Sequence, residues 1–222
     1  LGAVAQWQAE PADLKLCVVV GLKDDDACDF LKGIPPGAVP ATTIGDGTHG
    51  HADHQIALPS GVAFVPDQPH LLVAVSRGSN QVRVYNTQGG GLQLLCKFGN
   101  ADGRFGNVPA ELSRPWDIVV AVGADGTILV VVSENQNHRL TVLRLILSAG
   151  GRRAQLEFVR TIGSIGTGEG QLQFPSGLAL RTVAGMEQTI LCADYTNFRV
   201  VEFTLAGIFL RNIGTPSYGS GA

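Results

Sequence analysis

The sequence predicts an all-β protein built from repeated antiparallel strands, and three observations support that prediction. Glycine is frequent, with 29 of 222 residues, which is about twice its average usage of about 7%. Hydrophobic residues make up 45% of the chain and charged residues only 16%, a composition that favours a packed core over disorder. The longest apolar runs, such as Leu16–Leu22 and Ile128–Val132, are strand-sized, and helical periodicity is absent.

A short motif of an apolar residue followed by glycine divides the chain into units. Its four copies are Thr43-Ile44-Gly45, Lys97-Phe98-Gly99, Thr161-Ile162-Gly163 and Asn212-Ile213-Gly214. The intervals between successive glycines are 54, 64 and 51 residues. After each of the first three copies a polar loop leads to a proline, Pro59, Pro115 or Pro175, which opens an apolar strand. Such self-similarity at a nearly fixed period indicates a repeat architecture.

Four short strands are expected in each unit. The first strands are predicted at 58–63, 114–119 and 174–179, the second at 71–75, 128–132 and 190–193, the third at 82–85, 140–143 and 200–203, and the fourth at 92–98, 156–162 and 208–213. The first two strands are continuously apolar, as expected for strands buried on both faces, whereas the outer strands alternate. Four strands in a unit of this length are typical of a β-propeller blade.

The whole chain, 1–222, is accordingly predicted to be one propeller domain or part of one. We expect a degenerate blade over 1–44, with a strand at Leu16–Val20 and another around 27–31, and full blades over 45–99, 100–163 and 164–214. Residues 215–222 are expected to begin the next loop.

The third unit resembles an NHL repeat in two stretches, Thr161–Ala179 and Cys192–Phe203. The similarity extends over residues 42–214, although Ser76 and Ser133 stand where the third unit has Asp194, and the second unit has an extra turn residue and a long outer hairpin. The resemblance implies a β-propeller, usually of about six blades. The three to four blades expected here do not close such a ring, so we expect further blades outside this chain or a second copy.

Antiparallel order places the turn between the second and third strands of each unit on the same face as the loop between units. We call this the loop-rich face: it comprises residues 76–81, 133–138 and 194–198 from the turns and 45–58, 99–114 and 163–174 from the loops. Loops on a rigid scaffold often carry binding residues, although each candidate could instead only stabilise a turn. The candidates are Arg77, Asn80, Arg104, Arg114, Trp116, Glu134, Asn137, His138, Tyr195 and Asn197.

A possible metal site lies in one of these loops. Three of the five histidines, His49, His51 and His54, fall within six positions, with Asp53 among them. Imidazoles beside a carboxylate suit zinc. A solvated loop is the alternative, because structural zinc sites seldom take all their ligands from so short a segment. No other cofactor is expected.

The leading functional hypothesis is a non-enzymatic interaction module that binds a protein or peptide on the loop-rich face. The alternatives are a metal-dependent propeller enzyme that uses the His49–His54 loop, and RNA binding by the same face. A net charge of −3 weakens the RNA alternative, and no nucleophile motif supports catalysis. Four cysteines without a paired spacing, and no membrane-spanning run or signal-peptide pattern, favour an intracellular, cytoplasmic protein.

Overall fold

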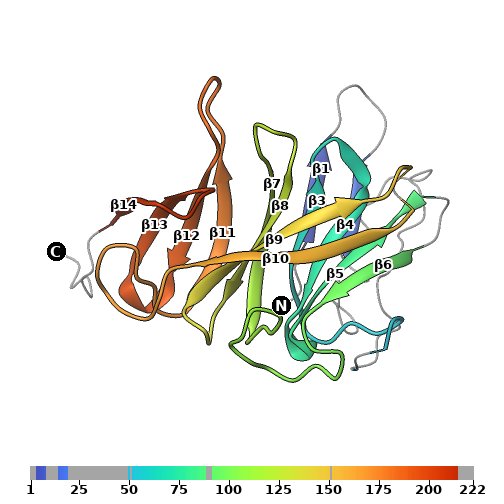
Figure 1. The fold of residues 1–222 in the computed structure, drawn as a ribbon, viewed down its shortest axis with the longest axis horizontal. Coiled ribbons are helices and arrows are strands. Elements are labelled where there is room, and N and C mark those ends of the chain that lie inside the picture. Colours follow the sequence, from blue (N-terminus) through green and yellow to red (C-terminus); the bar gives the residue numbers. More distant parts are fainter. Residues whose placement is uncertain are drawn as a thin grey trace.

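The chain forms three four-stranded antiparallel sheets and one two-stranded hairpin within the residues that the computed structural model describes, which are 4–8, 15–19, 50, 52–88, 92–150 and 152–214. The three sheets lie side by side like the blades of a propeller (Figure 1). The predicted all-β fold with propeller-like blades is therefore confirmed.

Each sheet follows chain order from its first strand to its fourth. The first blade contains β3 (Pro59–Val65), β4 (Gln68–Ser76), β5 (Gln81–Asn86) and β6 (Gln93–Phe98). The second contains β7 (Pro115–Val122), β8 (Ile128–Glu134), β9 (Arg139–Leu147) and β10 (Ala154–Ile162). The third contains β11 (Pro175–Arg181), β12 (Thr189–Asp194), β13 (Arg199–Thr204) and β14 (Phe209–Ile213).

A hairpin of β1 (Val4–Gln8) and β2 (Lys15–Val19) precedes these blades, and β1 lies against β3. Strand β2 begins one residue before the strand expected at Leu16–Val20. The strand expected around residues 27–31, the first glycine motif at Gly45 and the tail 215–222 lie outside the described residues.

The same backbone conformation recurs at two places in each blade. The residue before the first strand adopts a left-handed conformation, with φ of 47° at Leu58, 44° at Arg114 and 53° at Phe174. The last residue of the β4–β5, β8–β9 and β12–β13 turns does the same, at Asn80, His138 and Phe198. Non-glycine residues seldom adopt positive φ, so a threefold recurrence shows that the blades share one design.

Strand register identifies which residues are equivalent between blades, and it corrects one prediction. Pro59 pairs with Ser76, Pro115 with Glu134 and Pro175 with Asp194. Glu134, and not Ser133, therefore occupies the Asp194 position, and the second turn has no extra residue. The sequence alignment of Ser133 with Asp194 was wrong because the second blade has a glutamate, and not an aspartate, at this position.

Glycine is required after the fourth strand, at Gly99, Gly163 and Gly214, where φ is 109°, 83° and 95°. At Gly99 a side chain would also clash, because an added Cβ would lie 2.3 Å from the Asn80 carbonyl oxygen. The glycine of the repeated motif thus lets the chain leave β6 close to the preceding turn.

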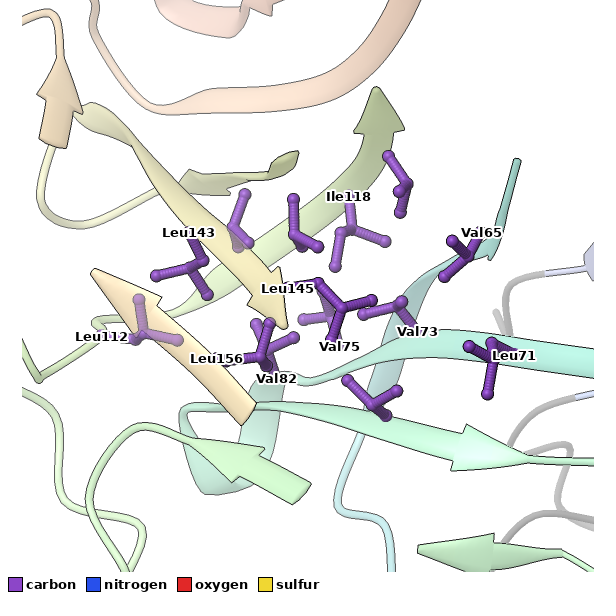
Figure 2. Packing of buried hydrophobic residues seen from close by; sticks show 14 residues of the cluster. Val65, Leu71, Val73, Val75, Val82, Leu112, Ile118, Leu143, Leu145 and Leu156 are labelled. Atoms are coloured by element: carbon purple, nitrogen blue, oxygen red, sulfur yellow. The ribbon is translucent and has the colours of Figure 1, made fainter. Parts of the chain in front are cut away.

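Two apolar clusters fill the spaces between neighbouring blades. The first joins the first and second blades through residues such as Val73, Val75, Val82, Ile118 and Leu143, which point toward one another in Figure 2. The second cluster joins the second and third blades. Burying a large apolar side chain stabilises the fold by about 1.5 to 3 kcal/mol, so these clusters are the main source of rigidity between blades.

The third blade differs on the side that points away from the second. Glu202 occupies the position of the buried Val142 of the second blade, as the matching strand registers show. Its carboxylate accepts hydrogen bonds from Thr189 Oγ1 and Arg211 Nε, each at 2.6 Å. These hydrogen bonds and the nearby arginines lower the pKa of Glu202. Part of this side of the sheet is therefore polar, whereas its counterpart in the second blade is apolar.

Candidate functional site

The loop-rich face is held together by asparagine side chains that donate to glycine carbonyls, and those of Asn137 and Asn197 occupy equivalent positions. Asn80 Nδ2 donates to the Gly103 carbonyl at 2.9 Å, and Asn137 and Asn197 donate to the carbonyls of Gly106 and Gly166 at 2.8 Å. These bonds bring the turns and the loops between blades together, along the lower edge of Figure 1. Three predicted binding side chains are thus used to position the loops.

In the second blade, buried Glu134 anchors the β8–β9 turn. Its carboxylate accepts hydrogen bonds from Arg139 Nε at 2.8 Å, Asn137 Nδ2 at 2.6 Å and the Ser113 amide at 3.0 Å, and also from the Thr141 hydroxyl. Buried charges are stable only when paired and hydrogen-bonded in this way. Glu134, predicted as a binding residue, is therefore a structural anchor without an exposed atom to offer a ligand.

The third blade repeats this anchor with Asp194 and Arg199. Arg199 Nε donates to Asp194 at 2.9 Å, and Asn197 Nδ2 donates to the same carboxylate at 2.8 Å. The guanidinium also donates to three loop carbonyls, those of Thr167, Gly168 and Gln171. The loop before β11 is therefore fixed by a buried arginine.

The first blade anchors its β4–β5 turn without a buried carboxylate. Ser76 Oγ accepts the Ala57 amide at 3.0 Å, and Gln81 replaces the arginine. Arg83, two residues further along β5, is fully buried; it donates to Gln81 Oε1 and to the carbonyls of Ala52 and Gln55. The sequence does not indicate this role, because an arginine between two valines on an outer strand is typical of a solvent-facing position.

The first seam is the contact between the β4–β5 turn of the first blade and the start of β7 in the second. The Arg77 guanidinium lies over the Trp116 ring, 4.6 Å from its centroid. Asn80 Oδ1 accepts the Arg114 amide at 2.8 Å. The first seam therefore brings together four of the ten predicted binding residues.

The second seam is the corresponding contact between the β8–β9 turn and the start of β11. His138 Nδ1 accepts the Phe174 amide at 3.1 Å, and the two rings meet edge to face with centroids 4.5 Å apart. Asn135 Nδ2 donates to the Pro175 carbonyl at 3.3 Å. Burial lowers the pKa of His138, and the Asp194 carboxylate partly opposes that shift.

Asp117 links the second and third blades near the starts of their first strands. Its carboxylate accepts the amides of Ile118 and Leu178, both at 2.8 Å. Burial raises the pKa of Asp117, and these two amide hydrogen bonds oppose the shift. A perturbed carboxyl can mark a functional site, but both oxygens of this one already accept a backbone amide, one of them from the third blade.

Large apolar side chains are exposed on the loop-rich face. Among the described residues, six of the twelve exposed large hydrophobic side chains lie there, and a seventh, Trp116, lies next to it at the start of β7. They are Leu58, Phe105, Val108, Trp116, Ile165, Tyr195 and Phe198. Of these, only Trp116 and Tyr195 are among the binding residues predicted from the sequence. Arg104, also predicted, pairs with Asp102 at 2.6 Å and is exposed.

The predicted metal site falls mostly outside the described residues. His49 and His51 are not described, and His54 is an exposed residue of the loop before β3. No group of three metal-ligating side chains occurs in the part of the chain that the structure describes. In that same part, no helix has the length and apolar character to cross a membrane.

Comparison with known proteins gives structural similarity alone. No family model matches the sequence, and no curated protein matches it. The structure is similar to the periplasmic gluconolactonase of Pseudomonas aeruginosa, with a TM-score of 0.46 and 20% identity over 72% of this chain and 40% of that one. It is also similar to a functionally unknown protein of Desulfotomaculum acetoxidans, with a TM-score of 0.49 and 17% identity over 74% of this chain and 45% of the other. The matched region spans less than half the length of either protein, and at these scores the similarity assigns no activity.

Proposed function

We propose that the chain is a binding module whose loop-rich face binds another protein or a peptide. The observation that carries this proposal is the concentration of exposed apolar side chains there, with Phe105 75% and Tyr195 70% exposed. Exposed apolar groups gathered on one face are typical of interaction sites, and aromatic residues often dominate their binding energy.

The rigidity of the loops supports the same function. Arg83, Arg139 and Arg199 each donate to loop carbonyls from within the blades. A surface that is already ordered loses less conformational entropy on binding. The apolar side chains are thus presented by loops that need little rearrangement.

The charges on this face favour a protein over RNA. Asp53, Asp102 and Glu169 are exposed there alongside Arg104 and Arg114. Affinity for a nucleic acid depends on positive charge that is not offset by nearby acids. A mixed surface of aromatic and charged groups suits a protein partner better.

The test uses the full chain as immobilised bait, with bound proteins cross-linked in the lysate and quantified by mass spectrometry. The double variant Phe105→Ser with Tyr195→Ser should reduce specific capture by about tenfold or more, because loss of central aromatic contacts costs about 2 kcal/mol or more. The matched control is Met186→Ser with Ile208→Ser, which removes exposed apolar side chains at the opposite ends of the strands. Capture that is lost in the control and kept in the loop-rich-face variant would contradict the proposal.

A further inference from the structure

We propose that the first seam binds an acidic segment of the partner, with Arg77 and Arg114 holding its carboxylates and Trp116 contacting a neighbouring apolar side chain. This inference rests on the proposed function and deepens it by giving the chemistry of the bound segment. It follows from the charge, the exposure and the rigidity of three residues at one place.

The two arginines of the first seam are cations without an acidic partner. Within the described ranges, neither Arg77 nor Arg114 makes an ion pair, and neither do Arg144, Arg152, Arg153 and Arg160, which lie away from the first seam, whereas six other cations do. Those that pair are Lys97, Arg104, Arg139, Arg181, Arg199 and Arg211. Arg114 is exposed and Arg77 is half-buried. A carboxylate placed between them would meet positive charge that the described part of the protein leaves unneutralised.

Trp116 gives this seam a rigid apolar surface. Trp116 is 38% exposed, and the Arg77 guanidinium carbon lies over its ring, 4.6 Å from the ring centroid. A guanidinium that lies over an aromatic face is held there by a cation–π contact and keeps N–H donors available to a carboxylate. The contact therefore positions Arg77 for binding without using its hydrogen-bond donors.

The backbone of Arg114 is fixed from both sides. Its amide donates to Asn80 Oδ1 at 2.8 Å, and its carbonyl accepts the Asn135 amide at 3.1 Å. The left-handed conformation of Arg114, with φ of 44°, is held by these contacts. Leu58 and Phe174 adopt the same conformation at the equivalent positions, so it belongs to the shared blade design, and here it fixes the backbone of a cation two residues before Trp116.

The second seam shows that these charges are not needed to join two blades. At the positions of Arg77, Arg114 and Trp116 it has Asn135, Phe174 and Ser176, as the strand registers establish. Across the second seam, Asn135 donates to the Pro175 carbonyl and the Phe174 amide donates to His138. Two blades can therefore pack without the cationic and aromatic groups of the first seam, and we attribute those groups to binding.

A short acidic peptide fits this surface better than a nucleic acid. Asp102 and Glu111 lie in the loop that leads to Arg114, and Asp102 already pairs with Arg104. The phosphates of a nucleic acid would lie close to these carboxylates, and the repulsion between like charges would weaken binding. One or two peptide carboxylates with an apolar neighbour can use both arginines and Trp116 and avoid that repulsion.

The experiment titrates the full chain with an acetylated, amidated peptide of alternating leucine and glutamate, and follows Trp116 emission in a Trp7→Phe background. Anisotropy of a fluorescein-labelled peptide with the unaltered chain gives the same affinity without relying on that substitution. We expect saturable binding that weakens about tenfold or more when glutamine replaces glutamate, since each charge-assisted hydrogen bond contributes about 1.5 to 3 kcal/mol. Arg77→Gln and Arg114→Gln should each weaken binding about tenfold.

The matched control is Arg152→Gln, an exposed arginine in the β9–β10 turn at the opposite ends of the strands, which should leave the affinity unchanged. Equal affinity for the glutamate and glutamine peptides, or an equal effect of Arg152→Gln, would overturn the inference. So would a labelled single-stranded RNA that binds more tightly than the acidic peptide and depends on the same arginines. If the acidic peptide fails while Phe105→Ser with Tyr195→Ser still abolishes capture, the proposed function stands and this inference alone is wrong.

Discussion

The first and second seams share one backbone conformation but differ in their buried anchors and in their outward-facing residues. In the second seam the charge is inside, where Glu134 and Arg139 form a buried ion pair, and the outer contacts of Asn135, His138 and Phe174 are uncharged. In the first seam Ser76 and Gln81 replace the ion pair, the buried Arg83 donates to Gln81, Arg77 lies over Trp116, and Arg114 is exposed.

Comparing the two seams distinguishes the features that join the blades from the residues that are available for binding. Both seams keep the left-handed residue before the proline and an acceptor side chain for its amide. The outward-facing residues vary between them, and so do the buried anchors, which are Ser76 and Gln81 in the first blade and Glu134 and Arg139 in the second. Because the shared features are enough to join two blades, the outward residues of the first seam are free to serve binding.

The largest expected effect is on the buried anchors. Glu134→Ala leaves the Arg139 guanidinium without its carboxylate and should lower the free energy of unfolding by about 3 to 5 kcal/mol. Ser76→Ala, at the equivalent position, removes only the hydroxyl that accepts the Ala57 amide and should cost about 1 to 2 kcal/mol. Urea unfolding followed by circular dichroism measures both. Equal losses would show that the two anchors do not differ as described.

A smaller effect is expected from acid at the second seam. The pKa of His138 is lowered by burial in the folded chain, whereas in the unfolded chain it returns to about 6.5. As the pH falls below about 6.5 the unfolded chain binds this proton first, so the free energy of unfolding decreases over that window. Protonation would also set an N–H against the Phe174 amide.

His138→Asn places the residue of the first seam at this position and keeps an acceptor that does not titrate. We expect this variant to lose part of the decrease in the free energy of unfolding below about pH 6.5. Urea unfolding at a series of pH values compares it with the unaltered chain, and Asn80→Ala, which changes the first seam, serves as the reference. An unaltered pH dependence in His138→Asn would count against the role given to His138.

The sequence predicted much of the fold because the blade signals are local. Pro59, Pro115 and Pro175 open strands, and Gly99 and Gly163 close units through their positive φ. These residues act through their own backbone, so their spacing alone locates the strands.

The candidate site was less predictable because its residues act through distant partners. Asn137 and Asn197 look like free polar turn residues, yet each donates to a loop carbonyl 31 positions away. Arg83 is buried only because the loop before β3 folds over it. The exposure of Phe105 likewise depends on how its loop is held and not on its sequence neighbours.

The smallest expected effect on stability comes from converting the first seam to the second. Arg77→Asn with Trp116→Ser should change the free energy of unfolding by less than about 1 kcal/mol, since an exposed cation–π contact contributes about 0.5 to 1 kcal/mol. The same variant should no longer bind the acidic peptide with measurable affinity. Urea unfolding and the anisotropy of the labelled peptide measure the two effects, and a loss of stability as large as that of Glu134→Ala would mean that the pair is structural.

Hydrogen–deuterium exchange of the full chain, with and without the glutamate–leucine peptide at saturation, tests the central claim most directly. If the first seam is the binding site, the peptide slows exchange of amides in residues 77–80 and 114–116 and leaves those in 135–138 and 174–176 unchanged. Protection confined to the second seam, or to the β11–β12 hairpin tip at 182–188, would contradict it.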